Sequence, residues 1–548
     1  MNNTKLLLRM ASLPKDIGQE NIITAGDKDP IKMKETGSSD LKPWDRAHQA
    51  YQDDSDISFA EPEVDSSEYY YPVPLDIEKA AATAKGLLPK EDYNKFMDFW
   101  PRPDANAIWH IGDDFSQLKA AKEEVKALPD KKVIRIAHFD TGYDPTHISY
   151  PEKLIRKDLQ RNFVEGEEDR IHDASDSFNK GFVKMPGHGT GTLSILAGTK
   201  VAIPHCGFDD YLGLYDSVEI VPIRISKSVV LLKSGAFVRA MDYVINNLHK
   251  NDNTKIHIIT MSMGGLASRA WADMVNEAYD KGIFIVTAAG NNYNKFPTRT
   301  LIYPSRFKRV VAACGVTYDY SPYHKEGSEA AFDLMEGNFG PNALMKTAIA
   351  AFTPNVPWAT YRFQEVVGIR GDGTSSATPQ IAAAAALYYM KYHKELEALP
   401  EPWMKVEAIR KVLFDSAKKE IKGYEGDYFK FYGNGVLQAK KMLERKVPEA
   451  ATLEKEEEDN VSFPFFRLIL RTANLVDEAA EKNDMLETEL MQLLLTNHDL
   501  QRLLNDEEAN IEDMTDNELR VFIDAVLANK DASDTLKFNL AELKRVLQ

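Results

Sequence analysis

A serine in the segment GTSSATP, at 373–379, is the first candidate for chemistry in this chain. Pro379 suits the first turn of a helix, because its missing N–H would be unpaired there anyway. Ser375 is then expected on the loop that enters the helix, with its hydroxyl exposed and backbone N–H groups nearby to bind an oxyanion. A serine hydroxyl is a weak nucleophile at neutral pH, so acyl transfer at Ser375 requires a base from elsewhere in the chain.

A histidine and an aspartate supply that base and the group that orients it. His188 stands between two glycines in GHGTGT, at 187–192, which leaves its imidazole open at the start of an apolar run. Asp140 opens the segment Asp-Thr-Gly directly after an apolar strand, and the carboxyl ends of parallel strands line the ligand crevice of an open sheet. Each motif alone also occurs in ordinary turns. With Ser375 they predict a triad of acid, base and nucleophile.

The oxyanion of an acyl-transfer intermediate also needs a preorganised donor. Asn291 lies just beyond an apolar strand in the segment TAAGNN, and its side-chain amide is the candidate. His138 and Asp140 form a His-x-Asp pair of the kind that some metal hydrolases use, but that interpretation leaves the motif around Ser375 unexplained. No loop shows a calcium-binding pattern of clustered oxygen ligands, so we expect no cofactor and no metal ligands among the site residues, and calcium binding stays open without a motif to indicate it.

The elements that must position these residues are predicted from hydrophobic patterns between residues 115 and 445. Short β-branched apolar runs alternate there with helical stretches, which is typical of an α/β fold with a parallel sheet covered by helices. The predicted strands are 133–139, 218–225, 256–262, 283–289 and 310–316. The predicted helices are 115–128, 234–249, 267–281 and 378–397.

Both ends of the chain differ from this central region. The first 104 residues are predicted to be an irregular extension that serves as a regulatory or pro-segment, because 51–70 is rich in acids and contains no Lys or Arg. Part of it is interpreted either as a solvated linker or as a segment that lies over a neighbouring domain through aromatic residues: Trp44, Tyr69, Tyr70 and Tyr71.

The other end is predicted to be a solvated acidic linker at 451–460 followed by an all-helical module. Leucines at helical spacing mark one packing face: Leu486, Leu490, Leu493, Leu500 and Leu504. Thr515 and Glu518 form a capping box before a further helix. We expect these helices to bind a protein partner, to self-associate, or to pack on the catalytic domain.

Charge and cysteine content narrow the classes of function. With 67 Lys and Arg against 84 Asp and Glu, the net charge of −17 has the wrong sign for a protein that follows phosphate backbones, so we expect no nucleic-acid partner. Only two cysteines, Cys206 and Cys314, are present, which excludes a disulfide framework and favours a reducing, cytoplasmic location. The N-terminal apolar run is too short for a signal peptide, and no apolar stretch approaches the roughly 20 residues of a membrane-spanning helix.

Taken in order, the motifs DTG, HGTGT, MSMGG, AAGNN and GTSSATP resemble those of the subtilisin-like serine proteases, or subtilases. The resemblance covers about 105–445, which divides the chain into 1–104, 105–445 and 446–548. It implies a parallel sheet flanked by helices and an Asp-His-Ser order of catalytic residues. The spacings between the motifs are longer than those of the compact secreted members of this family. This predicts insertions at 150–180 and 320–365 that lie around the cleft.

Carried over residue by residue, the resemblance implies Asp140 as the orienting acid, His188 as general base and Ser375 as nucleophile. It implies Asn291 as the oxyanion donor. It also implies a group of substrate-binding residues that pair with the substrate backbone and line the pocket for the residue before the scissile bond: Ser262, Met263, Gly264 and Gly290.

The function expected from these observations is an intracellular serine endopeptidase that cleaves polypeptides through an acyl-enzyme. Unrestricted proteolysis would endanger a cytoplasm, so we expect restricted or regulated specificity. A catalytically silent, peptide-binding scaffold of the same fold is the alternative, and the complete triad argues against it. A sedolisin-type acid peptidase would use an acidic oxyanion group, so His188 and Asn291 argue against that assignment.

Overall fold

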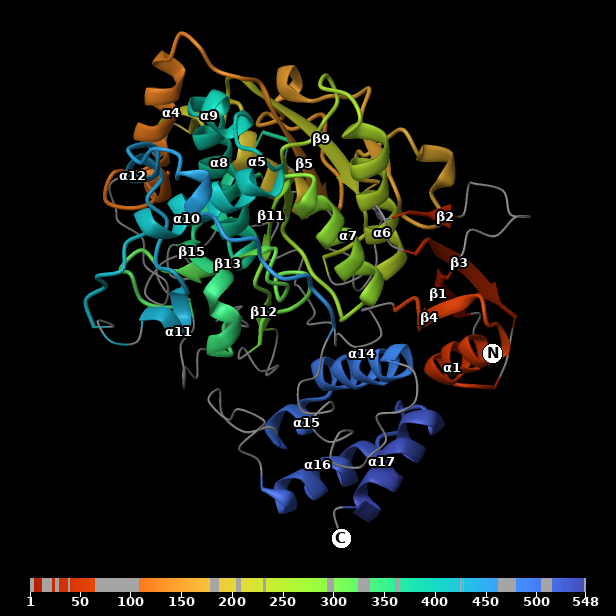
Figure 1. The fold of residues 1–548 in the computed structure, drawn as a ribbon. Coiled ribbons are helices and arrows are strands. Elements are labelled where there is room, and N and C mark those ends of the chain that lie inside the picture. The colour runs from red at the N-terminus through yellow and green to blue at the C-terminus, as the bar shows by residue number, and fades with distance from the viewer. Residues whose placement is uncertain are drawn as a thin grey trace.

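The computed structural model describes residues 4–11, 22–24, 29–37, 40–64, 108–177, 187–203, 208–229, 233–292, 300–323, 336–359, 364–365, 367–423, 426, 428–461, 480–503 and 515–546. A central sheet with helices on both sides makes up most of them (Figure 1). A small N-terminal sheet lies beside helices α6 and α7, and a group of C-terminal helices lies next to that small sheet (Figure 1).

The central sheet has seven strands in the order β15-β13-β11-β10-β5-β9-β6. All neighbouring pairs are parallel. The strands are β5 (Ile134–Asp140), β6 (Arg161–Asn162), β9 (Val218–Arg224), β10 (Ile258–Met261), β11 (Phe284–Ala288), β13 (Val311–Val316) and β15 (Ala348–Phe352). The five predicted strands and the α/β class are confirmed.

The edge strand β15 was not predicted. It lies in the segment 320–365, which the sequence analysis treats as an insertion over the cleft. Its residues, AIAAF, include one β-branched side chain, so the run lacks the composition by which the other strands are recognised. The segment therefore supplies a strand of the main sheet.

Helices cover both faces of the sheet because successive strand residues point to opposite sides. Ile134 and Ile136 of β5 pack in one cluster with the helices of the first face. That face carries α4 (Leu118–Ala127), α5 (His188–Ala197), α8 (Thr374–Lys391), α10 (Trp403–Ser416) and α12 (Ala439–Leu443). Ala137 and Phe139 pack instead with α6 (Ser234–Asp242) and α7 (Arg269–Asp280). His138 and Asp140 share the parity of Ile136 and so lie on the α5 and α8 side.

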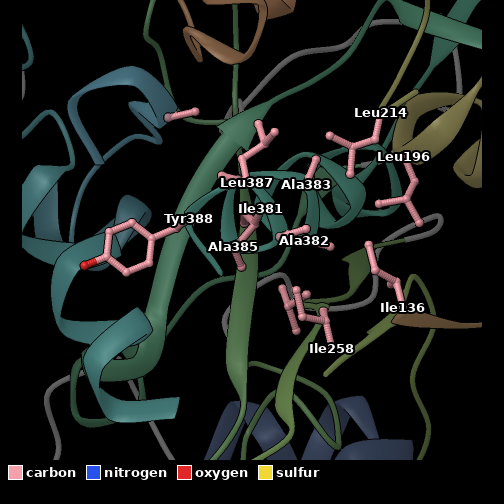
Figure 2. Close-up of a cluster of buried hydrophobic side chains, with 14 of the residues drawn as sticks. Ile136, Leu196, Leu214, Ile258, Ile381, Ala382, Ala383, Ala385, Leu387 and Tyr388 are labelled. Atoms are coloured by element: carbon pink, nitrogen blue, oxygen red, sulfur yellow. The ribbon is translucent and has the colours of Figure 1, made fainter. Parts of the chain in front are cut away.

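Helix α8 runs through the interior of the first face. Figure 2 shows Ile381 and Ala382 of this helix beside Ile136 of β5 and Ile258 of β10. Its many alanines let the helix approach the sheet closely. The predicted helix 378–397 is therefore confirmed, but it begins earlier than predicted and is divided into α8 and α9 (His393–Glu397). The other predicted helices are also present, with 234–249 divided into α6 and a π-helix at Tyr243–Leu248.

The N-terminal unit is a four-stranded antiparallel sheet in the order β2-β3-β1-β4. Its elements are β1 (Thr4–Met10), β2 (Ile22–Ile23), β3 (Ile31–Thr36), α1 (Pro43–Asp53) and β4 (Ile57–Pro62). The acidic composition predicts an irregular extension, and for these residues that prediction is wrong. Leu6 and Leu8 face α1, while Leu7 faces α6 and α7, so both faces of β1 are buried. Tyr69, Tyr70 and Tyr71 lie outside the described residues.

The C-terminal helices are α14 (Ala480–Thr496), α15 (His498–Leu503), α16 (Asp516–Ala528) and α17 (Asp534–Val546). The capping box of Thr515 and Glu518 is present. The leucine face is buried within this chain, in the cluster that includes α7; its described members are Leu486, Leu490, Leu493 and Leu500, and Leu504 lies outside the described residues.

The acidic segment 451–460 before these helices is mostly exposed, as predicted, but Asp459 in it is buried. Both carboxylate oxygens of Asp459 accept backbone hydrogen bonds, from Lys308 N at 2.7 Å and Arg309 N at 2.9 Å. Burial raises the pKa of Asp459 to about 6. The prediction of a solvated linker is thus wrong at this position, because the turn at 308–309 offers donors that composition cannot reveal.

Shorter elements complete the described chain: η3 (Trp109–Ile111), η4 (Glu152–Leu154), η5 (Glu168–Arg170), β7 (Lys200–Ile203), β8 (Phe208–Tyr211), η8 (Asn342–Thr347), α11 (Tyr428–Tyr432) and η9 (Ala450–Thr452). Over the residues that the structure describes, no helix combines the length and apolarity needed to cross a membrane. Cys314 is buried in β13, and burial raises the pKa of its thiol to about 12, so it is an unreactive core residue. Cys206 lies outside the described residues.

Candidate active site

Asp140 and His188 form a buried hydrogen-bonded pair at the carboxyl end of β5. Asp140 ends that strand and His188 opens α5, which brings His188 Nδ1 to 2.8 Å from Asp140 Oδ1. Thr141 N donates to the same oxygen at 2.7 Å. Burial alone would raise the pKa of Asp140, but the charge and the hydrogen bond of His188 hold that pKa below its ordinary value. The carboxylate is therefore ionised and orients the ring, with Nε2 turned away from it.

Thr192 connects a second histidine to the same carboxylate. Thr192 Oγ1 donates to Asp140 Oδ2 at 2.9 Å, and His138 Nε2 lies 2.8 Å from Thr192 Oγ1. A hydroxyl has one proton, so Thr192 donates to Asp140 and accepts from His138, which places the proton of His138 on Nε2. Burial lowers the pKa of His138, and the ring is neutral. The His-x-Asp pair is thus bridged by a hydroxyl.

Ser375 lies at the end of the neighbouring strand. In the register of β5 and β10, Phe139 is opposite Met261, so Asp140 and Ser262 leave the sheet at the same level. Ser375 Oγ donates to Ser262 O at 3.0 Å, and Ser262 Oγ donates to Ser375 O at 3.0 Å. Helices α5 and α8 pack against each other on this side of the sheet. The three residues predicted as acid, base and nucleophile therefore gather at adjacent strand ends.

Pro379 explains why the carbonyl of Ser375 is open to Ser262. Helix α8 begins at Thr374, so Pro379 lies inside the helix and not in its first turn as predicted. A proline has no N–H to donate to the carbonyl four residues earlier, and that carbonyl belongs to Ser375. The hydroxyl of Ser262 donates to it instead.

Asn291 is oriented by the residue before the predicted nucleophile. Its Oδ1 accepts hydrogen bonds from Thr374 N at 2.8 Å and from Thr374 Oγ1 at 3.1 Å. The amide nitrogen Nδ2 is then the end that remains to donate. Gly373 has φ +73°, and a Cβ there would lie 2.9 Å from Asn291 Nδ2, so a glycine is required for this approach. The strand β12 (Asn291–Asn292) pairs with β14 (Glu336–Gly337), which holds Asn291 at the site.

The predicted substrate-binding residues differ in which of their atoms are available to a substrate. Ser262 contacts Ser375 directly. The side chain of Met263 is buried in the core with α6 and α7, so only its backbone is available to a substrate. Gly264 and Gly290 both approach the side chain of Ile302.

Three neighbours of the predicted triad residues could not be recognised from the sequence. Thr192 and Thr374 lie inside the quoted motifs HGTGT and GTSSATP, but nothing in their spacing indicates a role. Trp358 belongs to β16 (Val356–Ala359), which pairs with β17 (Val367–Gly371). Its ring lies 5.4 Å from the His188 ring, and a Cβ on Gly191 would meet it at 1.8 Å. Part of the predicted insertion 320–365 therefore does reach the site.

No group of three or more His, Cys, Asp or Glu side chains among the described residues is arranged to hold a metal ion. The polar groups around Asp140 instead bind one another and backbone atoms. Every hydrogen bond described above joins two groups of the protein, and together these bonds hold a carboxylate, an imidazole, a hydroxyl and an amide at the adjacent ends of β5, β10 and β11. That set of groups suits acyl transfer.

Known proteins share this central region. The Subtilase family matches residues 131–435. Subtilisin E of Bacillus subtilis strain 168 is 26% identical over 280 residues, which are 50% of this chain and 60% of its own length. Subtilisin DY of Bacillus licheniformis is 26% identical over 322 residues, 58% of this chain and 94% of its own. An intracellular serine protease of Paenibacillus polymyxa is 25% identical over 295 residues, 53% and 78% of the two lengths.

The matched region contains the four residues that the motifs single out, Asp140, His188, Asn291 and Ser375, and it contains the parallel sheet that positions them. It leaves out the N-terminal sheet and the C-terminal helices, and the chain spans about 60% of the length of Subtilisin E. Because the match covers more than half of the chain, the chain belongs to the subtilase family.

Proposed function

We propose that this chain is a serine endopeptidase that hydrolyses polypeptides through an acyl-enzyme. The observation that carries the proposal is the pairing of an ionised, buried Asp140 with His188 at the sheet end where Ser375 lies. A peptide-binding scaffold would have no use for this pair. Family membership supports the same reaction class.

In the proposed reaction, Ser375 first turns its hydroxyl from Ser262 O toward His188 Nε2. The imidazole takes the proton as Ser375 Oγ attacks the scissile carbonyl carbon, and Asp140 stabilises the resulting imidazolium. Asn291 Nδ2 donates to the oxyanion. His188 then returns the proton to the leaving amine, and a water repeats the sequence to release the acyl group. No metal or cofactor takes part in these steps.

We place this activity in the cytoplasm, on the basis of the near absence of cysteine and the acidic composition. The distant similarity to an intracellular serine protease agrees with this placement. A protease in that compartment needs restraint, and we assign the restraint to the first 100 residues.

Contacts of Glu61 support that assignment, because they dock the N-terminal unit on the catalytic domain. Its Oε1 accepts from Ser268 Oγ at 2.7 Å and from Ala270 N at 3.1 Å, and its Oε2 accepts from Arg269 N at 3.0 Å. These donors are at the N-terminus of α7, where a carboxylate is favoured. We expect deletion of 1–100 to raise the hydrolysis of short peptides, and an unchanged rate in a folded deletion variant would contradict the restraint.

The reaction class is tested with a fluorophosphonate probe and a peptide library. The purified protein is expected to be labelled at Ser375 and to cleave a limited set of sequences, while Ser375→Ala is neither labelled nor active. Absence of labelling of a folded wild-type protein would favour the peptide-binding scaffold.

A further inference from the structure

Ile302 occupies the space between two glycines at the candidate substrate site. A Cβ built on Gly264 would lie 2.3 Å from Ile302 Cδ1, and a Cβ built on Gly290 would lie 3.0 Å from Ile302 Cγ2. The side chain therefore contacts both glycine backbones and fills the gap between them. A side chain on Gly264 would overlap Ile302, whereas at Gly290, which has φ +106°, a Cβ would first meet Asn338 Nδ2 at 2.7 Å and then Ile302.

Backbone hydrogen bonds fix Ile302 in this position. Ile302 N donates to Ala289 O at 3.1 Å. The next residue, Tyr303, pairs with Gly265 through bonds of 2.8 and 3.3 Å. Leu301 and Tyr303 are buried on either side, whereas Ile302 keeps part of its surface exposed. The backbone at Ile302 is thus held by hydrogen bonds to two neighbouring segments, while its side chain is partly exposed.

The space between Gly264 and Gly290 lies next to the groups that are proposed to react. A scissile carbonyl held between Ser375 Oγ and Asn291 Nδ2 has its Cα one bond from the attacked carbon. Gly290 directly precedes Asn291, and Gly264 follows Ser262, which contacts Ser375, by two residues. The side chain on that Cα therefore projects toward the two glycines, where Ile302 already fills the space.

We propose that Ile302 limits cleavage to sites after small residues, namely Gly, Ala and Ser, by closing the pocket for the residue before the scissile bond. The proposal rests on the proposed endopeptidase function. A larger side chain would have to displace Ile302 from its contacts with both glycines, and a packed interior resists added volume.

The test compares peptides that differ only in the residue before the scissile bond, with Ala, Leu or Phe at that position. The wild-type protein is expected to prefer Ala to Phe by roughly tenfold or more in kcat/KM, the scale on which pocket shape discriminates. Ile302→Ala is expected to raise kcat/KM for Phe by a similar factor while changing the value for Ala less. Ile302→Val is expected to fall between the two. Val521→Ala, on the exposed surface of α16, is the matched control and leaves the preference unchanged.

The outcomes separate this proposal from the endopeptidase assignment. Hydrolysis with a wild-type preference for Phe or Leu overturns the role of Ile302 and leaves the endopeptidase in place. Fluorophosphonate labelling of Ile302→Ala shows that its active site is formed, and an unchanged preference in that labelled variant also overturns the role. A folded wild-type protein that neither reacts with the probe nor cleaves any peptide contradicts the endopeptidase itself.

A second inference comes from contacts between the two ends of the chain. Helix α14 of the C-terminal module lies against β4 of the N-terminal sheet, close to α1 (Figure 1). Met485 of α14 is fully buried in the hydrophobic cluster that contains Leu6, Leu8, Trp44 and Phe59. A C-terminal side chain thus completes the core of the N-terminal unit.

Polar contacts also join α1 of the N-terminal unit to α14. Trp44 Nε1 donates to Gln492 Oε1 at 2.8 Å, and Gln492 Nε2 donates to Ala267 O at 2.7 Å. Gln492 therefore bridges the N-terminal unit to the segment that leads into α7. His48 Nε2 lies 3.3 Å from Glu489 Oε2, and both side chains are buried.

Helix α17 makes a third contact with α1. Asp45 Oδ1 accepts hydrogen bonds from Asp534 N at 2.9 Å and from Thr535 N at 3.3 Å, which caps the N-terminus of α17. Lys42 Nζ donates to Ala532 O at 2.8 Å. The N-terminal unit is therefore held by α14 and α17 in addition to its contacts with α7.

We infer that the C-terminal module retains the N-terminal unit on the catalytic domain when the chain between them is cut. A unit of about 60 residues buries too little surface for much stability of its own. With part of its core supplied by α14, its association depends on the C-terminal helices rather than on the covalent connection through 65–107.

The test introduces a site for a sequence-specific protease between residues 65 and 100 of the full chain, in a Ser375→Ala background that prevents self-cleavage. After the cut, the N-terminal fragment is expected to co-elute with the remainder. Met485→Ala is expected to speed its dissociation by roughly tenfold or more, because truncating a buried methionine removes core packing. Phe538→Ala, which truncates an apolar side chain that is 67% exposed on α17, is the control and leaves the rate unchanged.

Trp44→Phe keeps an aromatic ring but removes the donor to Gln492, and serves if Met485→Ala does not fold. It is expected to speed dissociation by a smaller factor. If the fragment dissociates from the parent protein as fast as from both variants, retention by the C-terminal module is overturned. Retention is also overturned if the fragment dissociates from none of the three proteins.

Discussion

Ser262 and Ser375 exchange hydrogen bonds: each hydroxyl donates to the backbone carbonyl of the other, at 3.0 Å in both directions. The exchange depends on Pro379, which cannot donate to Ser375 O within helix α8. The predicted nucleophile is therefore attached through two contacts to the strand that is expected to bind the substrate backbone. Before Ser375 can react, its hydroxyl must break the hydrogen bond that it donates to Ser262 O.

Ser375→Ala is expected to lower kcat by several orders of magnitude, because the hydroxyl forms the acyl bond. Stability is expected to change little, since the lost hydroxyl makes one hydrogen bond and Ser262 Oγ still donates to the backbone of residue 375. Peptide hydrolysis and thermal unfolding measure the two effects. The matched control is Ser376→Ala, one residue along the same helix, which is expected to retain activity within a few-fold. Retention of more than about a tenth of the wild-type kcat in Ser375→Ala would remove it from the nucleophile role.

Asn291→Ala is expected to lower kcat by roughly 10²–10³ with little change in KM, the range established for such a donor in subtilisin itself. The loss falls on kcat because the amide acts mainly on the oxyanion of the transition state. Thr374→Val retains the backbone donor to Asn291 Oδ1 and removes the hydroxyl donor, so we expect a smaller loss of the same kind. An unchanged kcat in Asn291→Ala would contradict its assignment as oxyanion donor.

The central sheet and the pairing of Asp140 with His188 could be predicted because both depend on local signals. Each of the five predicted strands is a short, mostly apolar run, and each of Asp140, His188 and Ser375 lies within a short motif. The strand β15 could not be predicted, because its alanines become a strand only beside β13. Trp358 likewise lies beside His188 because β16 pairs with β17.

The N-terminal sheet could not be predicted because, on composition alone, its acids indicate solvent exposure. Glu61 is buried, and it is stabilised by three donors at the start of α7, more than 200 residues away in sequence. Asp459 is buried for a similar reason. A carboxylate that caps a distant helix or turn has no signature in its own neighbourhood, so composition alone assigns it to a loop.

Thr192→Val is expected to lower kcat by roughly tenfold or more, since a hydrogen bond to a buried charged group is worth about 1.5–3 kcal/mol. The substitution removes the donor to Asp140 Oδ2 and the acceptor for His138 Nε2 without a large change of shape. Thr192→Ser keeps the hydroxyl and is expected to restore most of the activity. If the valine and serine variants had equal kcat, the hydroxyl would have no part in positioning Asp140.

The stability of the fold is expected to fall as the pH drops from about 6.5 toward 3, in part through His257. This ring is buried beside β5 and against Tyr389 of α8, its Nδ1 accepts from Arg135 N at 3.0 Å, and burial lowers its pKa to about 3. In the unfolded chain the pKa returns to about 6.5, so over this range the unfolded state binds more protons and the free energy of unfolding decreases with acidity. His257→Asn keeps an acceptor for Arg135 N and removes the titration. Its midpoint of thermal unfolding should therefore fall less between pH 7 and pH 5 than that of the wild-type protein, and parallel pH dependences would contradict the assignment.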